Sequence, residues 1–192
     1  MVTIRMVTWV DAPVERCFKL ATSVDFQLAS ARSENIRAVA GVKNGPLEQG
    51  DTVTWQGRIF GLGKTHTSRM EVSRPFHYLL EVMVAGGFQF YEHERHFAAM
   101  DDGTRIKDEV RFSARMGPLG RLMEKVVLRR RLTTLLRWRN EALKQVAESD
   151  TWKRFLEGNP EEPAANSQER SGSKVEVKSH FLAHQRATTF PK

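Results

Sequence analysis

The fold is decided by the stretch YEHERHFAAMDDGTRIKDEVRF, residues 91–112. Its two halves have the composition of β-strands, and Asp101-Asp102-Gly103 between them predicts a hairpin turn. In the second half, alternate residues place one mostly apolar row on a single face of the strand: Ile106, Asp108, Val110 and Phe112. The opposite face carries charges and belongs in water. Asp108 is therefore a carboxylate in an apolar row, and a polar group on a buried face needs a partner or a ligand.

The first half of the hairpin supplies candidates for that partner. Tyr91, His93, Arg95 and Phe97 have the same parity, so they lie on one face of their strand. Pairing of the two strands brings this face beside the row that contains Asp108. We predict a mostly apolar sheet face with a few polar groups set into it, which suits an amphipathic small molecule.

The N-terminal flank predicts a strand and an amphipathic helix. Residues 2–10 are rich in Val, Thr and Ile. Asp11 is placed to cap a helix whose first turn contains Pro13. Apolar side chains then recur at helical spacing, at Val14, Cys17, Phe18 and Ala21. We expect this helix to end near Asp25, or to continue as a second short helix through Leu28.

More strands and a long helix complete the pattern. Strands are expected at 36–42, 52–60, 64–73 and 77–85, and a helix at 119–148, with a last turn near Phe155. Residues 158–192 are rich in Pro, Glu, Ser and Lys, which predicts a disordered tail. The order predicts an α+β fold in which a curved antiparallel sheet of about seven strands grips a long C-terminal helix, within one domain at 1–157.

Composition excludes several classes of protein. The 192 residues carry a net charge of +7 and a sequence pI of about 9.9, which favours anionic partners. Cys17 is the single cysteine, so an internal disulfide is excluded and a thiolate metal cluster is not expected. No run of about 18 apolar residues is present. Because the N-terminus has a strand pattern rather than that of a signal peptide, we predict a cytoplasmic protein.

Several motifs resemble those of a known superfamily. The matching residues are Tyr91, His93, Phe97, Gly103-Thr104, Asp108, Val110, Phe112 and Gly117-Pro118-Leu119-Gly120, together with the helix opening at Asp11–Phe18. This set resembles the START-like superfamily with the helix-grip fold, which includes lipid-transfer START domains, Bet v 1 plant allergens and bacterial polyketide cyclase/dehydrase-like proteins. The nearest likeness is to bacterial SRPBCC ligand-binding proteins, which often have Trp where this chain has Tyr91. The resemblance covers residues 1 to about 150.

The resemblance implies binding of a hydrophobic or amphipathic small molecule, lipid or polyketide-like, in a cavity between the sheet and the C-terminal helix. The residues expected to contact it are Trp55, Ile59, Leu80, Val82, Tyr91, His93, Arg95, Phe97, Asp108, Val110 and Phe112. Two alternatives remain open: a cyclase or dehydratase that uses His93 and Asp108, or a non-catalytic interaction module that has a filled core and acts through its basic helix. The polar pair could equally satisfy itself and fix the strand register.

Other partners can be weighed from the motifs. Phosphate-loop, dinucleotide, nucleophile and zinc signatures are absent from the sequence, so we predict neither a cofactor nor a metal. Arg129, Arg130 and Arg131 lie in the most basic part of the long helix. They form either a solvated basic face or a contact with an anionic membrane surface. Nucleic acid is not indicated, because Trp138 is the one aromatic residue in that helix.

Overall fold

The structure is a computed structural model that describes residues 1–31, 36–59, 62–114 and 124–157. The chain divides into two units, Met1–Glu161 and Glu162–Lys192. The second unit lies outside the described residues, as does the predicted disordered tail at 158–192. Everything that follows concerns the first unit.

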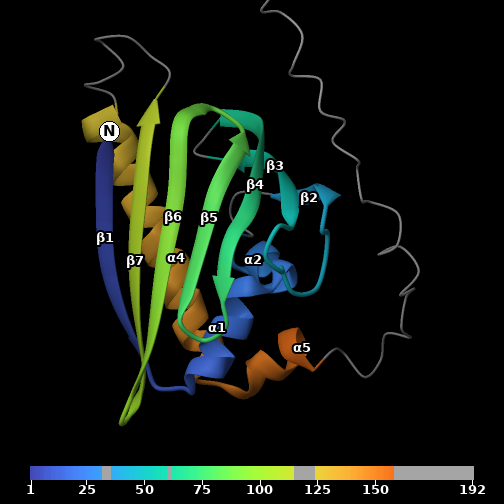
Figure 1. Ribbon diagram of the computed structural model, residues 1–192, viewed down its shortest axis with the longest axis vertical. Helices are drawn as coiled ribbons and strands as arrows, with labels where there is room; N and C mark the ends of the chain where they lie inside the picture. Colours follow the sequence, from blue (N-terminus) through green and yellow to red (C-terminus); the bar gives the residue numbers. More distant parts are fainter. Residues whose placement is uncertain (32–35, 60–61, 115–123, 158–192) are drawn as a thin grey trace, which may run out of the picture. The chain divides into compact units, whose positions relative to one another are not determined.

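The first unit is built from strands that precede a long helix (Figure 1). The strands are β1 (Val2–Val10), β2 (Arg37–Gly41), β3 (Thr52–Ile59), β4 (Leu62–Arg74), β5 (Tyr78–Ala85), β6 (Phe88–Met100) and β7 (Gly103–Ala114). The helices are α1 (Val14–Thr22), α2 (Val24–Ser30), α4 (Arg129–Ala147) and α5 (Lys153–Leu156). A π-helical turn, η2 (Glu124–Leu128), leads into α4, and a 3-10 turn, η3 (Asp150–Trp152), precedes α5.

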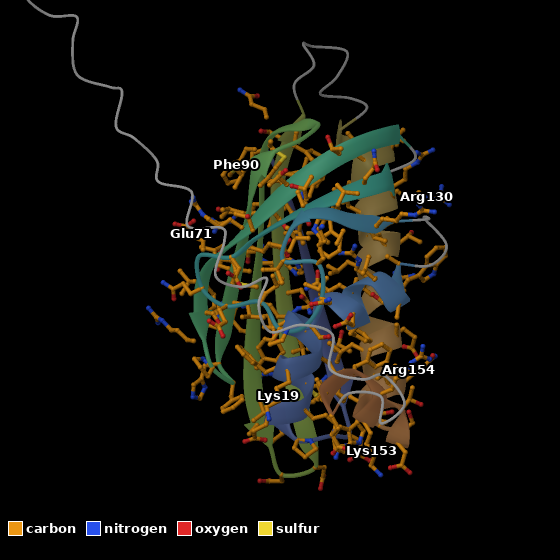
Figure 2. All side chains as sticks on the ribbon, turned by 90° about the vertical axis from the view of Figure 1, so that its right-hand side faces the viewer. Lys19, Glu71, Phe90, Arg130, Lys153 and Arg154 are labelled. Carbon is orange, nitrogen blue, oxygen red and sulfur yellow. The ribbon has the colours of Figure 1, made fainter. Side chains whose placement is uncertain are left out.

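All seven strands join one antiparallel sheet in the order β1-β7-β6-β5-β4-β3-β2. The sheet curves, and α4 lies across its concave face while α1 and α2 cover one end (Figures 1 and 2). This arrangement confirms the predicted α+β helix-grip fold. The predicted hairpin is also present, with β6 and β7 joined at Asp101-Asp102 and Arg95 paired with Asp108.

The turn of this hairpin depends on Gly103. Its φ angle is +143°, in the region that favours glycine. A Cβ atom at this position would lie 2.3 Å from the backbone oxygen of Val10, at the end of β1. The glycine therefore lets the β6–β7 turn pack tightly against the neighbouring strand.

The first helix begins differently from the expectation. Asp11 does not cap it: Pro13 occupies the N-cap position, without a side-chain capping hydrogen bond, and the backbone N–H of Asp11 donates to Glu148 at 2.8 Å. The predicted capping role of Asp11 was wrong because α1 begins at Val14, two residues later than a helix capped by Asp11 would begin. The expected continuation as a second short helix is confirmed, and Ser23 caps α2 by accepting from the N–H of Phe26 at 3.2 Å.

Helix α4 faces the sheet with one stripe of its surface. Its buried residues follow helical spacing: Leu132, Leu136, Asn140, Leu143 and Ala147. The stripe contains one polar residue, Asn140. The part of the predicted helix at 119–123 lies outside the described residues. Because α4 lies along the concave face of the sheet, its buried stripe faces the polar residues predicted on β6 and β7, His93, Arg95 and Asp108.

Two buried clusters form the core. The larger includes Phe18, Phe26, Trp55 and Leu143, and joins α1 and α2 to the sheet and to α4. The smaller includes Val110, Phe112, Leu132 and Leu136. Phe18 packs edge-on against Phe97 with ring centroids 5.3 Å apart.

Candidate functional site

A buried polar network occupies the concave face of the sheet and centres on Asp108, whose side chain has no exposed surface. Arg95 on β6 donates through Nε to Oδ1 of Asp108 at 2.7 Å, and Nε2 of His93 lies 2.8 Å from the same oxygen. Asn140 on α4 donates through Nδ2 to Oδ2 of Asp108 at 2.7 Å. Both carboxylate oxygens are thus engaged by the protein itself.

Asn140 also extends the network. Its Oδ1 accepts from Nη2 of Arg95 at 3.2 Å, and its Nδ2 lies 3.0 Å from the hydroxyl oxygen of Thr8 on β1. The network therefore joins β1, β6 and β7 to α4. Polar networks of this kind specify how elements pack when every member is satisfied.

The environment fixes the charge of Asp108. Burial by itself raises the pKa of its carboxyl group, but the positive charge of Arg95 and the hydrogen bond from His93 outweigh burial. The pKa of Asp108 is consequently held well below its usual range. An ionised carboxylate only accepts hydrogen bonds, so Nε2 of His93 carries a hydrogen and donates it to Oδ1 of Asp108.

A cavity opens next to this network, between α4, helices α1 and α2, and strands β4 to β7. About 60 Å³ of it is open to the centres of water molecules, roughly four times the 15 Å³ that one water requires. Its apolar wall is formed by side chains such as Phe26, Leu79, Val110 and Leu136. His93 and Arg95 reach the same cavity from the network, so polar groups interrupt an otherwise apolar lining.

Further polar side chains line the cavity away from Asp108. Glu81 on β5, Tyr91 on β6 and Arg139 on α4 all contribute to its wall. The ring of Tyr91 contacts His66 edge-on, with centroids 5.7 Å apart. Burial is the largest influence on both rings: it lowers the pKa of His66 and raises the pKa of Tyr91 well above its ordinary value. Both rings are therefore neutral near pH 7.

The structure brings some of the predicted contact residues to the cavity and not others. Tyr91, His93, Arg95 and Val110 line it. Asp108 stands directly behind His93 and Arg95. Whether these residues bind a ligand stays a prediction.

Three predicted contacts belong to the packed core instead of the cavity wall. They are Trp55, Phe97 and Phe112, all buried on the concave side. Trp55 satisfies its indole N–H by donating to Ser68 at 3.2 Å. The side chain of Ile59 lies outside the described residues.

Leu80 and Val82 do not share the face of the cavity. They pair with Glu94 and Glu92 on β6, while Leu79 and Glu81 pair with Arg95 and His93. Because alternate residues point to opposite faces, the concave residues of β5 are Leu79 and Glu81. Most of β5 is apolar on both faces, so its pattern alone did not reveal which set faces inward.

Sequence reasoning missed Glu81, Arg139 and Asn140 as residues of the site. Asn140 carries a signal that could have found it: it is a polar residue in the middle of an apolar helical stripe, as Asp108 is in its strand. Arg139 is one of five arginines in α4, and nothing in the sequence distinguishes it from the others. Of these, Arg129, Arg130 and Arg131 are exposed, and Figure 2 shows Arg130 on the side of α4 away from the sheet.

Two further properties concern only the described part of the chain. None of its helices combines the length and hydropathy needed to cross a bilayer. Its His, Cys, Asp and Glu side chains form no group of three or more that could hold a metal ion. A membrane contact through Arg129, Arg130 and Arg131 stays a prediction.

Comparison with known proteins places this geometry in a family. The chain belongs to the family described as "Polyketide cyclase / dehydrase and lipid transport", which matches residues 1–148. This confirms the resemblance to the polyketide cyclase-like superfamily. The family is associated with binding of hydrophobic small molecules or lipids. None of the curated proteins matches the sequence.

Solved structures agree on the fold. The chain is similar to a protein of unknown function, SA2116, from Staphylococcus aureus, with a TM-score of 0.61, 12% identity, and coverage of 78% of this chain and 95% of that one. It is also similar to TTHA0849 from Thermus thermophilus, with a TM-score of 0.56, 20% identity, and coverage of 77% and 100%. Ara h 8.0201 aligns with a TM-score of 0.52, 13% identity, and coverage of 74% and 97%. At these identities the likeness concerns the fold alone.

Proposed function

We propose that this protein binds a hydrophobic or amphipathic small molecule in the cavity between the sheet and α4. The cavity is the observation that carries the proposal, because a core that served only stability would be filled to the density of a crystal. Its lining has the character of a ligand site: apolar residues dominate and a few polar groups interrupt them. Membership of the family supports the same class of ligand.

The polar network favours a binding role over a catalytic one. A general acid or base must exchange a proton with the substrate, and Asp108 is fully buried with both oxygens engaged by protein donors. His93 faces the cavity and is held in place by that carboxylate. We therefore assign the network the task of fixing the cavity wall and presenting His93 and Arg95 to the bound molecule.

A cavity-filling substitution tests the proposal. Leu135 lines the cavity from α4 and is half-buried, so Leu135→Trp should fill the space with little damage to the fold. The matched control is Gln145→Trp, which introduces the same side chain at an exposed position of the same helix. The probe is the neutral dye N-phenyl-1-naphthylamine, whose fluorescence rises in apolar surroundings.

We expect saturable dye binding by the unaltered protein and by Gln145→Trp, and a loss of about tenfold or more in affinity for Leu135→Trp. Ser30→Phe narrows the same cavity from α2 and should act in the same direction. Circular dichroism would verify that each variant is folded. Equal dye affinity in all four proteins would refute the proposal. The cyclase alternative would be supported instead if the protein chemically converted a bound molecule, and if His93→Gln abolished this conversion but retained binding.

A further inference from the structure

Arg139 has an unusual position for a charged side chain. It reaches the cavity from α4, and its Nε atom is buried without a hydrogen-bond partner. Among the described residues, Arg139 also forms no ion pair. A buried donor that lacks a partner costs free energy, and the cost is larger for a charged group. A hydrogen-bond acceptor on a bound molecule would remove this cost.

The other cation at the cavity is already neutralised. Arg95 donates to Asp108 at 2.7 Å and to Asn140 at 3.2 Å. Burial lowers the pKa of His66, which lies against Tyr91, and outweighs the opposing effect of the Glu81 charge, so the ring stays neutral near pH 7. Among the described residues that line the cavity, Arg139 is therefore the arginine whose charge no carboxylate of the chain pairs with.

Glu81 is the one acidic residue among the described residues that line the cavity. It stands on β5, and it forms no ion pair with Arg139. The charges of both residues act on Tyr91, which lines the same wall and offers a neutral O–H group. Glu81 opposes an anion in the cavity, whereas Arg139 attracts one.

We propose that the bound molecule carries a carboxylate head group that pairs with Arg139, while its apolar part lies against Val110, Leu132 and Leu136. This assignment rests on the proposed binding function and makes Arg139 the residue that selects for an acid. The carboxylate supplies the acceptor that the buried Nε lacks, and a guanidinium matches a carboxylate in geometry as well as charge. Because the cavity has a low dielectric, this pairing is stronger than it would be in water.

The test compares ligands that differ only in the head group. Octanoate, octan-1-ol and octylammonium have the same chain length, and their affinities can be measured by isothermal titration calorimetry at pH 7.5. We expect octanoate to bind most tightly. Arg139→Gln should weaken octanoate binding by about 10- to 100-fold, the range for losing one charged hydrogen bond, and should change octanol binding by less than about threefold. Glu81→Gln removes the like charge and should tighten octanoate binding.

Arg137→Gln is the matched control, because Arg137 is exposed on the same helix and its loss changes the net charge equally. It should leave all three affinities unchanged, and Leu135→Trp should weaken all of them. Octanol that binds as tightly as octanoate, with Arg139→Gln neutral for both, would overturn the carboxylate assignment and leave the binding function intact. Failure of all three ligands to bind would count against both proposals. Preference for octylammonium would identify Glu81 as the head-group residue and refute the role of Arg139.

Discussion

Replacing Asp108 by Asn should destabilise the fold severely, although the two side chains have nearly the same shape. Asp108 accepts from three donors: Nε2 of His93 at 2.8 Å, Nε of Arg95 at 2.7 Å and Nδ2 of Asn140 at 2.7 Å. An amide has one acceptor oxygen, so in either orientation its NH₂ group faces at least one of these donors. The substitution also leaves Arg95 without its counter-ion.

The magnitude follows from burial. The side chains of Arg95 and His93 are each 12% exposed and that of Asp108 is 0% exposed. The pair formed by Arg95 and Asp108 is therefore a buried ion pair. Removing one partner of such a pair costs about 3–5 kcal/mol. Urea unfolding followed by circular dichroism measures the loss. Glu109→Gln is the control: its pair with Arg5 spans 2.9 Å, but Arg5 is 68% exposed, so solvent screens this pair and its loss should leave stability nearly unchanged. A loss below about 1 kcal/mol for Asp108→Asn would refute the reasoning.

The same carboxylate makes stability depend on pH in a defined direction. The pKa of Asp108 in the folded protein lies below its ordinary value of 3.8, because Arg95 and His93 outweigh burial. The stabilisation is therefore fully present well above pH 3.8 and is lost as the pH falls toward the folded-state pKa. At pH 2.8, one pH unit below the ordinary pKa, Asp108 should account for a loss of about 1.4 kcal/mol in the free energy of unfolding. Between pH 6 and pH 2.8, Asp108→Asn should lose about that much less stability than the unaltered protein; equal losses would contradict this explanation.

Three further substitutions or measurements test the packing. Burial raises the pKa of the Cys17 thiol, which has no exposed surface, so Ellman's reagent should react with it only after unfolding; rapid labelling of the folded protein would contradict the structure. Phe18→Ala should cost about 3–5 kcal/mol in urea unfolding, because Phe18 is buried against Phe97; a cost under 1 kcal/mol would show that the contact is not formed. Gly103→Ala should lower the melting temperature, since the new Cβ atom would lie 2.3 Å from the oxygen of Val10, and an unchanged melting temperature would show that the turn relaxes freely.

The hairpin explains why part of the site was predictable. A two-residue turn fixes the register of β6 against β7, and alternation then fixes which residues share a face. His93, Arg95 and Asp108 could therefore be placed together from the sequence, and the structure joins them by hydrogen bonds.

The same reasoning failed on β5. Its residues Leu79, Leu80, Val82 and Met83 are apolar on both faces. Only its pairing with β6 placed Leu79 and Glu81 on the concave side and Leu80 and Val82 on the other.

The sequence by itself determined the order of the elements, the α+β helix-grip architecture and the polar row on β6 and β7. These depend on local periodicity and short turns, which neighbouring residues encode. Tertiary structure alone decided that Asn140 completes the network and that Arg139 reaches the cavity, because the rotation of α4 about its axis is set by packing against a sheet far away in the sequence. It also decided that the core contains a cavity, since filled and hollow cores use the same residue types and differ only in how completely their side chains occupy the space.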